Sequence, residues 1–311
     1  MSGVPAPVLA ELDEELAGLV AADVALGPLT TYRVGGPAAR FATVATDDDL
    51  ARVADAVRRT GVDVLVVGKG SNLLVADAGF DGLALQLAGT FAEVDVRGTT
   101  VRAGGAAALP VVARRTAAAG LRGFEWAVGV PGSIGGAVRM NAGGHGSDLA
   151  ASLVGVRVVD LAGGEDGAVT ADALELRYRS SAVAPHQVVA WAELELVPGD
   201  RTAAEAEISE IVRWRRANQP GGQNAGSVFT NPPGDSAGRL IDDAGCKGLR
   251  VGTAEVSPKH ANFIQADEGG RADDVWALMA EVRRRVHASS GVVLHAETRV
   301  VGLPPLPEPV G

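Results

Sequence analysis

Apolar residues recur at helical spacing in several stretches of the chain. In residues 46–61, apolar side chains repeat every three or four positions after a start rich in Asp and Thr, and Gly61 supplies a stop. These apolar side chains are Leu50, Val53, Ala54 and Val57. Further helices are predicted at residues 109–119, 204–216, 239–241 and 275–286. The last of these is strongly amphipathic, so we expect it to bury one face.

Strand patterns lie between these helices. A buried strand is predicted at residues 64–67 and a short apolar strand at 83–87, hairpins at 92–105 and 155–170, and a strand at 188–197. Residues 292–301 alternate, so a strand there would place Leu294 and Thr298 on one face and Glu297 on the other. Hairpins and helices occur without regular βαβ units. This mixture predicts an α+β fold.

Composition and charge exclude several classes of protein. Of the 311 residues, 47% are hydrophobic and 21% are charged, which is typical of soluble globular proteins. The formal net charge of −10 argues against a nucleic-acid partner. The single cysteine, Cys246, excludes an internal disulfide and a Cys-rich zinc site, and we expect no metal. An acidic N-terminal stretch and the lack of a long apolar run predict a cytoplasmic protein without a membrane partner.

Two glycine-containing loops could hold an anion. Residues 66–75, VVGKGSNLLV, follow a predicted strand, and their backbone N–H groups could form a nest for phosphate oxygens. Residues 129–144, GVPGSIGGAVRMNAGG, would let a flat cofactor or a phosphate lie against the backbone. Two such loops suit a ligand with two ends, and a dinucleotide has that shape. A pair of structural turns would use the same residues, so both interpretations stay open.

A third loop displays a serine. Residues 224–232, NAGSVFTNP, place Ser227 between a glycine and two apolar residues. The pattern is not the nucleophile elbow of hydrolases, and the nearest histidine, His260, is more than thirty residues away. A serine nucleophile needs a base within hydrogen-bond reach, and nothing local supplies one. The loop alone therefore does not say what Ser227 does, and a simple turn residue is an equal alternative.

Several motifs together carry a resemblance to a known family. GKGSNLLV and GVPGSIGGAVRMNAG resemble the FAD-binding domain of the vanillyl-alcohol-oxidase-like (PCMH-type) flavoproteins. RYRSS, NAGSVFTNP, AGRLIDDAGCKG, SPKHANFI and LHAETRVVG are similar to motifs of the UDP-N-acetylenolpyruvoylglucosamine reductase (MurB) family. The similarity extends from residue 29 to residue 302. The short spacing after RYRSS resembles the shorter type of the family, which lacks a tyrosine lid loop.

The resemblance implies a division into domains. Two subdomains would hold FAD, at residues 26–88 and 89–199, and a C-terminal substrate-binding domain would follow at residues 200–303. Residues 1–25 would then be an N-terminal extension and residues 304–311 a proline-rich tail. The PGD sequence at residues 198–200 is the best candidate for the boundary before the last domain. We expect the protein to be a monomer.

The resemblance also implies the reaction and its residues. An NADPH-dependent flavoenzyme with non-covalent FAD would reduce the enolpyruvyl ether of UDP-N-acetylglucosamine enolpyruvate. Arg179 and Glu297 match the groups that stabilise the developing negative charge, and Ser227 matches the general acid that protonates the carbon. Tyr178, Asn231 and Arg215 are expected to contact the substrate. The residues expected to bind FAD are Gly68, Lys69, Gly70, Ser71, Asn72, Leu73, Gly129, Pro131, Gly132, Ser133, Gly135, Gly136, Asn141 and Ala142.

Two positions depart from the family pattern. The family commonly has a lysine where this chain has Thr230, and a basic residue near the position of Asn218. Both changes remove positive charge that a UDP diphosphate could use, although Arg213, Arg215 and Arg216 could compensate. Two alternatives to the reductase therefore remain. One is a flavin oxidase, and the other is a paralogue that binds flavin or nucleotide sugar with little or no reductase activity.

Overall fold

The computed structural model describes residues 4–309, which form two compact units, each built from separate segments of the chain. Within the described residues, the first unit consists of residues 4–24, 39–69 and 81–215. The second consists of residues 25–38, 70–80 and 216–309. Residues 25–38 and 70–80 thus pack with the second unit, although the domain prediction groups nearly all of them with the first FAD-binding subdomain. Compact units and predicted functional domains are different divisions of the chain, and the functional division stays a prediction.

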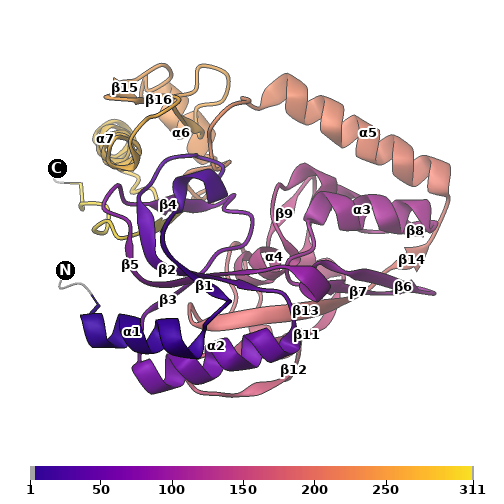
Figure 1. The fold of residues 1–311 in the computed structure, drawn as a ribbon. Helices are drawn as coiled ribbons and strands as arrows, with labels where there is room; N and C mark the ends of the chain where they lie inside the picture. Colours follow the sequence, from indigo (N-terminus) through magenta and orange to yellow (C-terminus); the bar gives the residue numbers. More distant parts are fainter. Residues whose placement is uncertain (1–3, 310–311) are drawn as a thin grey trace. The chain divides into compact units, whose positions relative to one another are not determined.

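A four-stranded sheet with two helices forms one part of the first unit. Its strands follow the order β1 (Val20–Ala25), β2 (Pro37–Val44), β5 (Phe80–Leu87) and β3 (Val64–Val66). Helices α1 (Ala6–Glu15) and α2 (Asp47–Thr60) pack side by side (Figure 1). A capping box between Thr46 and Asp49 starts α2, and Gly61 ends it in the left-handed conformation. The sequence prediction of this helix is confirmed.

An antiparallel five-stranded sheet forms the other part of the first unit. Its strand order is β12 (Asp166–Thr170), β11 (Leu153–Asp160), β13 (Gln187–Glu195), β7 (Thr100–Gly104) and β6 (Val94–Arg97). Both predicted hairpins, β6–β7 and β11–β12, are confirmed. Helix α4 (Ile134–Met140) packs on β13, and α3 (Leu109–Ala118) packs on the 3-10 turn η3 (Glu125–Gly129). Helix α5 (Arg201–Asn218) leads out of this unit.

Short elements complete the first unit. Strands β8 (Leu121–Arg122) and β14 (Val197–Pro198) pair, as do β9 (Gly143–Gly144) and β10 (Ser147–Asp148). The sequence analysis missed α1, β1, β2 and α4. Helix α4 was missed because its glycines are poor helix formers, yet Ser133 caps its start and Asn141 ends it in the left-handed conformation.

The second unit is built around helix α7 (Ala272–Ser290). It packs on a three-stranded sheet, β15 (Arg250–Val251), β16 (Ala254–Val256) and β17 (Ile264–Ala266), and on helix α6 (Ala237–Asp243) (Figure 1). The predicted apolar face of α7 is buried and consists of Val275, Leu278, Met279, Val282 and Val286. Strand β4 (Leu73–Val75) pairs in parallel with β18 (Arg299–Val301). Residues of the predicted phosphate loop therefore belong to the framework of this unit.

The last predicted strand is wrong in length. Only Arg299–Val301 form a strand, and residues 292–298 are irregular apart from one isolated bridge between Phe229 and Ala296. The backbone N–H groups of Glu297 and Thr298 both donate to the carbonyl of Val228, at 2.8 and 3.3 Å between N and O. A regular ladder cannot direct two successive N–H groups to one carbonyl, because successive groups point to opposite sides. The alternation of apolar and polar residues at positions 292–298 therefore does not correspond to a regular strand.

No helix within residues 4–309 is both long enough and apolar enough to cross a membrane.

The start of α7 depends on a side chain almost 200 residues earlier. The carboxylate of Asp77 accepts hydrogen bonds from the backbone N–H groups of Ala272 (2.8 Å) and Asp273 (3.3 Å), while the N-cap residue Arg271 provides no side-chain cap. We expect Asp77→Ala to lower the free energy of unfolding by about 1 kcal/mol, the usual loss for a removed helix cap. Urea titration of the flavin-loaded protein measures this. Asp77→Asn keeps one acceptor oxygen and should lose less; equal losses would contradict the capping role.

Candidate active site

The loop that carries Ser227 begins with a tight turn. The side-chain oxygen of Asn224 accepts a hydrogen bond from the backbone N–H of Gly226 at 3.1 Å, and Gly226 has a φ of 74°. Such a positive φ favours glycine, so Gly226 fixes the direction in which the chain enters Ser227. Ser227 itself is half-buried, whereas the next two residues, Val228 and Phe229, are each 1% exposed. The loop is therefore anchored directly after the serine.

Asn262 holds that anchor with three hydrogen bonds. Its backbone carbonyl accepts from the N–H of Val228 at 2.9 Å. Its side-chain oxygen accepts from the N–H of Phe229 at 3.0 Å, and its side-chain nitrogen donates to the carbonyl of Phe229 at 2.8 Å. Asn262 is 4% exposed. In this irregular segment, one asparagine satisfies the backbone groups that a neighbouring strand would otherwise pair.

Both backbone groups of Glu297, its N–H and its carbonyl, are hydrogen-bonded. Its N–H donates to the carbonyl of Val228 at 2.8 Å, and its carbonyl accepts from the side-chain amide of Asn72 at 3.0 Å. The carbonyl of Asn72 in turn accepts from the N–H of Arg299 at 2.9 Å. The structure thus brings the segments of Ser227 and Glu297 together through one peptide group. Asn72 supports Glu297, and its predicted contact with FAD stays a prediction.

Tyr178 and Arg179 are the two central residues of a tight turn in the first unit. The backbone groups of Arg177 and Ser180 exchange two hydrogen bonds, at 3.0 and 3.1 Å. Arg179 has a φ of 55°, which is a strained conformation for a residue other than glycine. Its guanidinium donates to the carbonyl of Gly143 at 3.0 Å and lies 5.0 Å from the ring centre of Tyr178, which is 57% exposed. The turn displays both side chains at its tip.

Asn141 supports the turn of Tyr178 and Arg179 at its first residue, Arg177. Its buried side chain donates to the carbonyl of Arg177 at 3.2 Å and to the carboxylate of Asp148 at 3.2 Å, and it accepts from the N–H of Ala150 at 3.1 Å. These bonds tie the end of the second glycine loop to the start of the Tyr178–Arg179 turn. Contact between Asn141 and FAD stays a prediction.

Within the first unit, the two glycine loops meet. A Cβ atom added to Gly68 would lie 2.7 Å from the hydroxyl oxygen of Ser133, a distance too short for a real contact. Ser133 is 2% exposed, and its hydroxyl accepts from the N–H of Gly136 at the start of α4. The two loops therefore lie side by side, with glycine backbone at their meeting point. Such backbone can turn its N–H groups toward phosphate oxygens, so the residues fit FAD.

The remaining predicted FAD residues differ in exposure. Gly70 belongs to the second unit, where its φ is 59° and an added Cβ would lie 2.2 Å from the carbonyl oxygen of Leu29, so packing alone requires glycine there. Lys69, Pro131 and Gly136 are exposed, Ser71, Gly135 and Ala142 are half-buried, and Gly70, Leu73, Gly129 and Gly132 are buried. Their contacts with FAD stay predictions.

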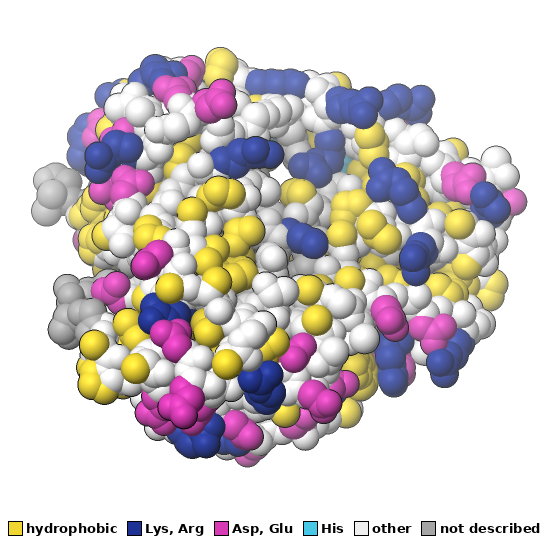
Figure 2. Space-filling view, in the orientation of Figure 1, with side chains coloured by type: hydrophobic (Ala, Val, Ile, Leu, Met, Phe, Trp, Pro, Cys, Tyr) yellow, Lys and Arg dark blue, Asp and Glu magenta, His cyan; other side chains and the backbone are white. Residues whose placement is uncertain are grey.

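Two of the predicted substrate contacts, Asn231 and Arg215, already have protein partners. The side-chain oxygen of Asn231 accepts from the N–H of Ala237 at 3.0 Å, at the start of α6. The guanidinium of Arg215 donates to the carbonyl of Gly129, and burial lowers its pKa. Arg215 lies on α5, and Figure 2 shows Lys and Arg side chains over this helix.

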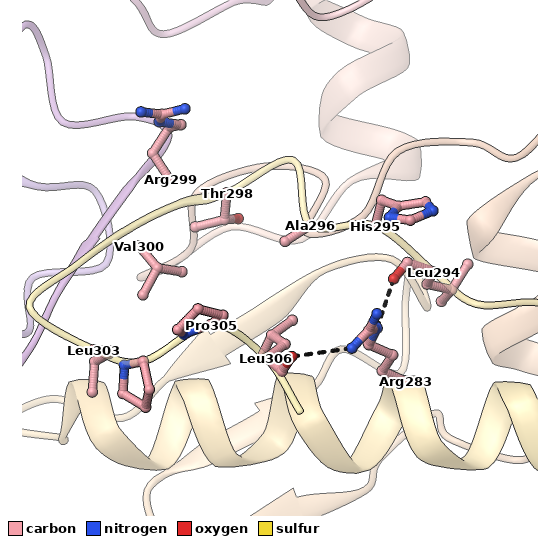
Figure 3. A pocket seen from close by; sticks show the side chains of 11 residues that line it. Arg283, Leu294, His295, Ala296, Thr298, Arg299, Val300, Leu303, Pro305 and Leu306 are labelled. Atoms are coloured by element: carbon pink, nitrogen blue, oxygen red, sulfur yellow. Dashed lines mark hydrogen bonds between the residues drawn. The ribbon is translucent and has the colours of Figure 1, made fainter. Parts of the chain in front are cut away.

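A groove of about 460 Å³ lies between residues 294–300 and the tail residues 303–306 (Figure 3). Every nitrogen of the buried guanidinium of Arg283 at its wall has a protein acceptor. The acceptors are the carbonyls of Leu294, Leu306 and Pro307 and the carboxylate of Glu308. Arg283 is therefore a structural link between the tail and the segment that precedes Glu297. The guanidinium of Arg283 is thus occupied by protein acceptors and does not mark this groove as an anion site.

Comparison with known proteins identifies the family. Residues 38–165 match a family model described as FAD binding domain, and residues 218–301 match the C-terminal domain of UDP-N-acetylenolpyruvoylglucosamine reductase. The chain is 43% identical over 279 residues to the protein of that name from Heliobacterium modesticaldum, covering 88% of each chain. It belongs to the UDP-N-acetylenolpyruvoylglucosamine reductase (MurB) family. A relative from Acidiphilium cryptum is 42% identical over 306 residues, covering 96% of this chain and 97% of the relative.

Solved structures agree with this membership. The crystal structure of MurB from Thermus caldophilus has a TM-score of 0.78 at 37% identity, covering 91% of this chain and 98% of that chain. The glucose dehydrogenase Phl p 4.0202 has a TM-score of 0.50 at 16% identity, covering 93% of this chain and 60% of that one, which shows likeness of fold alone. The predicted α+β class, the FAD-binding domain and FAD as cofactor of the MurB family are confirmed.

Sequence reasoning missed the role of Asn262. Asn262 lies in SPKHANFI, one of the motifs that carry the resemblance, and the sequence indicated only a loop residue with a structural role. The available signal was an uncharged polar residue between alanine and phenylalanine, since a buried amide in such a place must have partners. Which partners it has could not be read from the motif.

We expect Gly68→Ala to reduce FAD binding. The added methyl group would collide with the hydroxyl of Ser133 and displace it from its bond at the start of α4, where the two loops meet. The ratio of flavin to protein absorbance in the purified protein should fall well below that of the unchanged protein.

Two variants control this experiment. Gly167→Ala adds a methyl group in open space on β12 and should leave flavin content unchanged. The double variant Gly68→Ala, Ser133→Ala removes the colliding hydroxyl and should recover part of the flavin. A normal flavin content in the Gly68→Ala variant would show that FAD binding does not depend on the close contact between Gly68 and Ser133.

Proposed function

We propose that the chain is the NADPH-dependent flavoenzyme that reduces UDP-N-acetylglucosamine enolpyruvate to UDP-N-acetylmuramate in peptidoglycan synthesis. Family membership over about nine-tenths of the chain supports the reaction. The observation that carries the assignment of residues is the hydrogen bond from the N–H of Glu297 to the carbonyl of Val228. It joins the loop of the proposed proton donor to the segment of the proposed charge-stabilising group.

The reaction adds a hydride and a proton across a carbon–carbon double bond. FAD held by the two glycine loops would supply the hydride for the terminal alkene carbon, with NADPH as its source. The electron pair of the double bond then moves to the adjacent carbon and into the substrate carboxylate. This charge must be stabilised until a proton arrives. Residues of the chain both stabilise the charge and supply the proton.

Ser227 donates the proton in this proposal. A serine hydroxyl is a very weak acid, so it transfers a proton only to a strong base and only when held in line with it. The carbanion-like carbon next to the carboxylate is such a base. The loop geometry supports the role, because the turn at Gly226 and the buried anchor at Val228 fix the serine on both sides. A histidine partner is unnecessary, since the hydroxyl acts as an acid and not as a nucleophile.

Arg179 and Glu297 stabilise the negative charge. The planar guanidinium of Arg179 can pair with the substrate carboxylate, and its turn and its bond to the carbonyl of Gly143 fix its place. Glu297 can assist only as a carboxylic acid or while sharing a proton, because a second carboxylate would repel the first. Both roles are proposals from the family motifs.

The diphosphate site uses a different charge distribution from the common family pattern. Thr230, which stands where the family commonly has lysine, donates from its hydroxyl (3.2 Å) and its N–H (2.9 Å) to the carbonyl of His295. We therefore assign the positive charge to Arg213, Arg215 and Arg216 at the end of α5, with Asn231 and Tyr178 as further substrate contacts. The monomeric state and the cytoplasmic location stay predictions from the sequence.

The decisive experiment is anaerobic stopped-flow absorbance. NADPH should bleach the flavin band, and UDP-N-acetylglucosamine enolpyruvate should then restore it. Ser227→Ala should leave the bleaching rate unchanged and slow the restoration by about 100-fold or more, the usual range for a lost general acid. Ser289→Ala, an exposed serine at the end of α7, should change neither rate. Bleaching without restoration in the unchanged protein would favour the paralogue without reductase activity.

Arg179→Lys should separate charge from geometry. Lysine keeps the positive charge but loses the planar pair of donors, so we expect kcat to fall by roughly 100-fold with a smaller change in KM. Steady-state kinetics with NADPH in excess measures both constants. An unchanged kcat would exclude the paired contact with the developing carboxylate charge.

A further inference from the structure

We infer that Asn262 is a positioning residue for the reaction, one that holds Ser227 and Glu297 in their productive places without touching the substrate. The inference rests on the proposed roles of these two residues. Its basis is the set of three hydrogen bonds by which Asn262 grips Val228 and Phe229, directly after the serine.

An asparagine suits this task for a geometric reason. Its side chain carries one carbonyl and one NH₂ group in a single plane, so it can pair with the N–H and the carbonyl of one residue at once. It does so with Phe229, at 3.0 and 2.8 Å. Neither aspartate, which has no donor when ionised, nor alanine can make both bonds. The side chain therefore acts as a one-residue strand partner for the serine loop.

Val228 links Asn262 to Glu297 by backbone hydrogen bonds. Val228 donates its N–H to the carbonyl of Asn262, and its own carbonyl accepts the N–H of Glu297. A rotation of the Val228 peptide would thus move Glu297 on one side and Ser227 on the other. Displacements of about 1 Å at a reacting group can cost 100-fold in rate, and in-line transfer from a weak acid is sensitive to such shifts.

Asn262 is itself held in place by its neighbours. Its N–H donates to the Nδ1 atom of His260 at 3.3 Å, and the N–H of Phe263 donates to the carbonyl of His260 at 3.0 Å. The rings of His260 and Phe263 meet edge to face, with centres 4.7 Å apart. The segment that carries Asn262 is therefore a small folded loop of its own. A rigid loop is what a positioning residue requires.

The test separates the two halves of the reaction in the flavin-loaded protein. Asn262→Ala and Asn262→Asp should leave bleaching by NADPH within about twofold of the unchanged protein, because that half needs no proton from Ser227. Restoration by UDP-N-acetylglucosamine enolpyruvate should slow by roughly 10- to 100-fold. The solvent deuterium isotope effect on restoration should rise, because a misplaced donor makes proton transfer more limiting.

Controls distinguish this role from loss of stability. Both variants keep the backbone carbonyl that accepts the N–H of Val228, and Asn262→Asp also keeps the side-chain acceptor for the N–H of Phe229, so it removes the donor to the carbonyl of Phe229 alone. Flavin content and melting temperature are measured for both variants before the kinetics. Val286→Ala removes buried volume from α7 in the same unit and should lower the melting temperature without slowing restoration. If the Asn262→Asp variant has a lower melting temperature but a normal restoration rate and isotope effect, Asn262 is structural only. Absence of restoration in the unchanged protein would instead refute the proposed reaction.

Discussion

The carbonyl of Val228 is the point on which the arrangement of the second unit depends. It accepts the N–H groups of both Glu297 and Thr298, and this double use ends any regular strand before Arg299. The interruption has a functional consequence. A residue in a regular strand has its backbone fixed by a neighbouring strand, whereas Glu297 is fixed by the serine loop itself. The geometry of one proposed catalytic segment is thus defined by the other.

Irregular backbone at this site must be satisfied by side chains. Buried N–H and carbonyl groups without partners are costly, so loops that are not strands need substitutes for strand pairing. Two asparagines provide them: Asn262 pairs with Phe229, and Asn72 donates to the carbonyl of Glu297. In the first unit, Asn141 supports the turn of Tyr178 and Arg179 in the same way. Amide side chains therefore form the framework under all three proposed catalytic residues.

Local signals explain which parts of this fold can be predicted from sequence. Helix α2 follows from Thr46, Asp49 and Gly61, and the buried face of α7 follows from its spacing of apolar residues. The last strand could not be predicted correctly, because the cause of its interruption lies at Val228, about seventy residues earlier. The bond between Asn72 and Glu297 spans 225 residues and leaves no local trace. Motifs indicated the residues that we propose for the reaction, but not the side chains that hold them.

Thr230 shows how one departure from a family pattern can follow from the same constraint. Its hydroxyl and its N–H both donate to the carbonyl of His295, two residues before Glu297. A lysine there could make the backbone bond but not the hydroxyl bond. The chain therefore has an additional fixed contact beside Glu297 where other family members commonly have a charge. In the proposed assignment the positive charge for the diphosphate comes from α5 instead, so substrate affinity and catalytic geometry would depend on different elements.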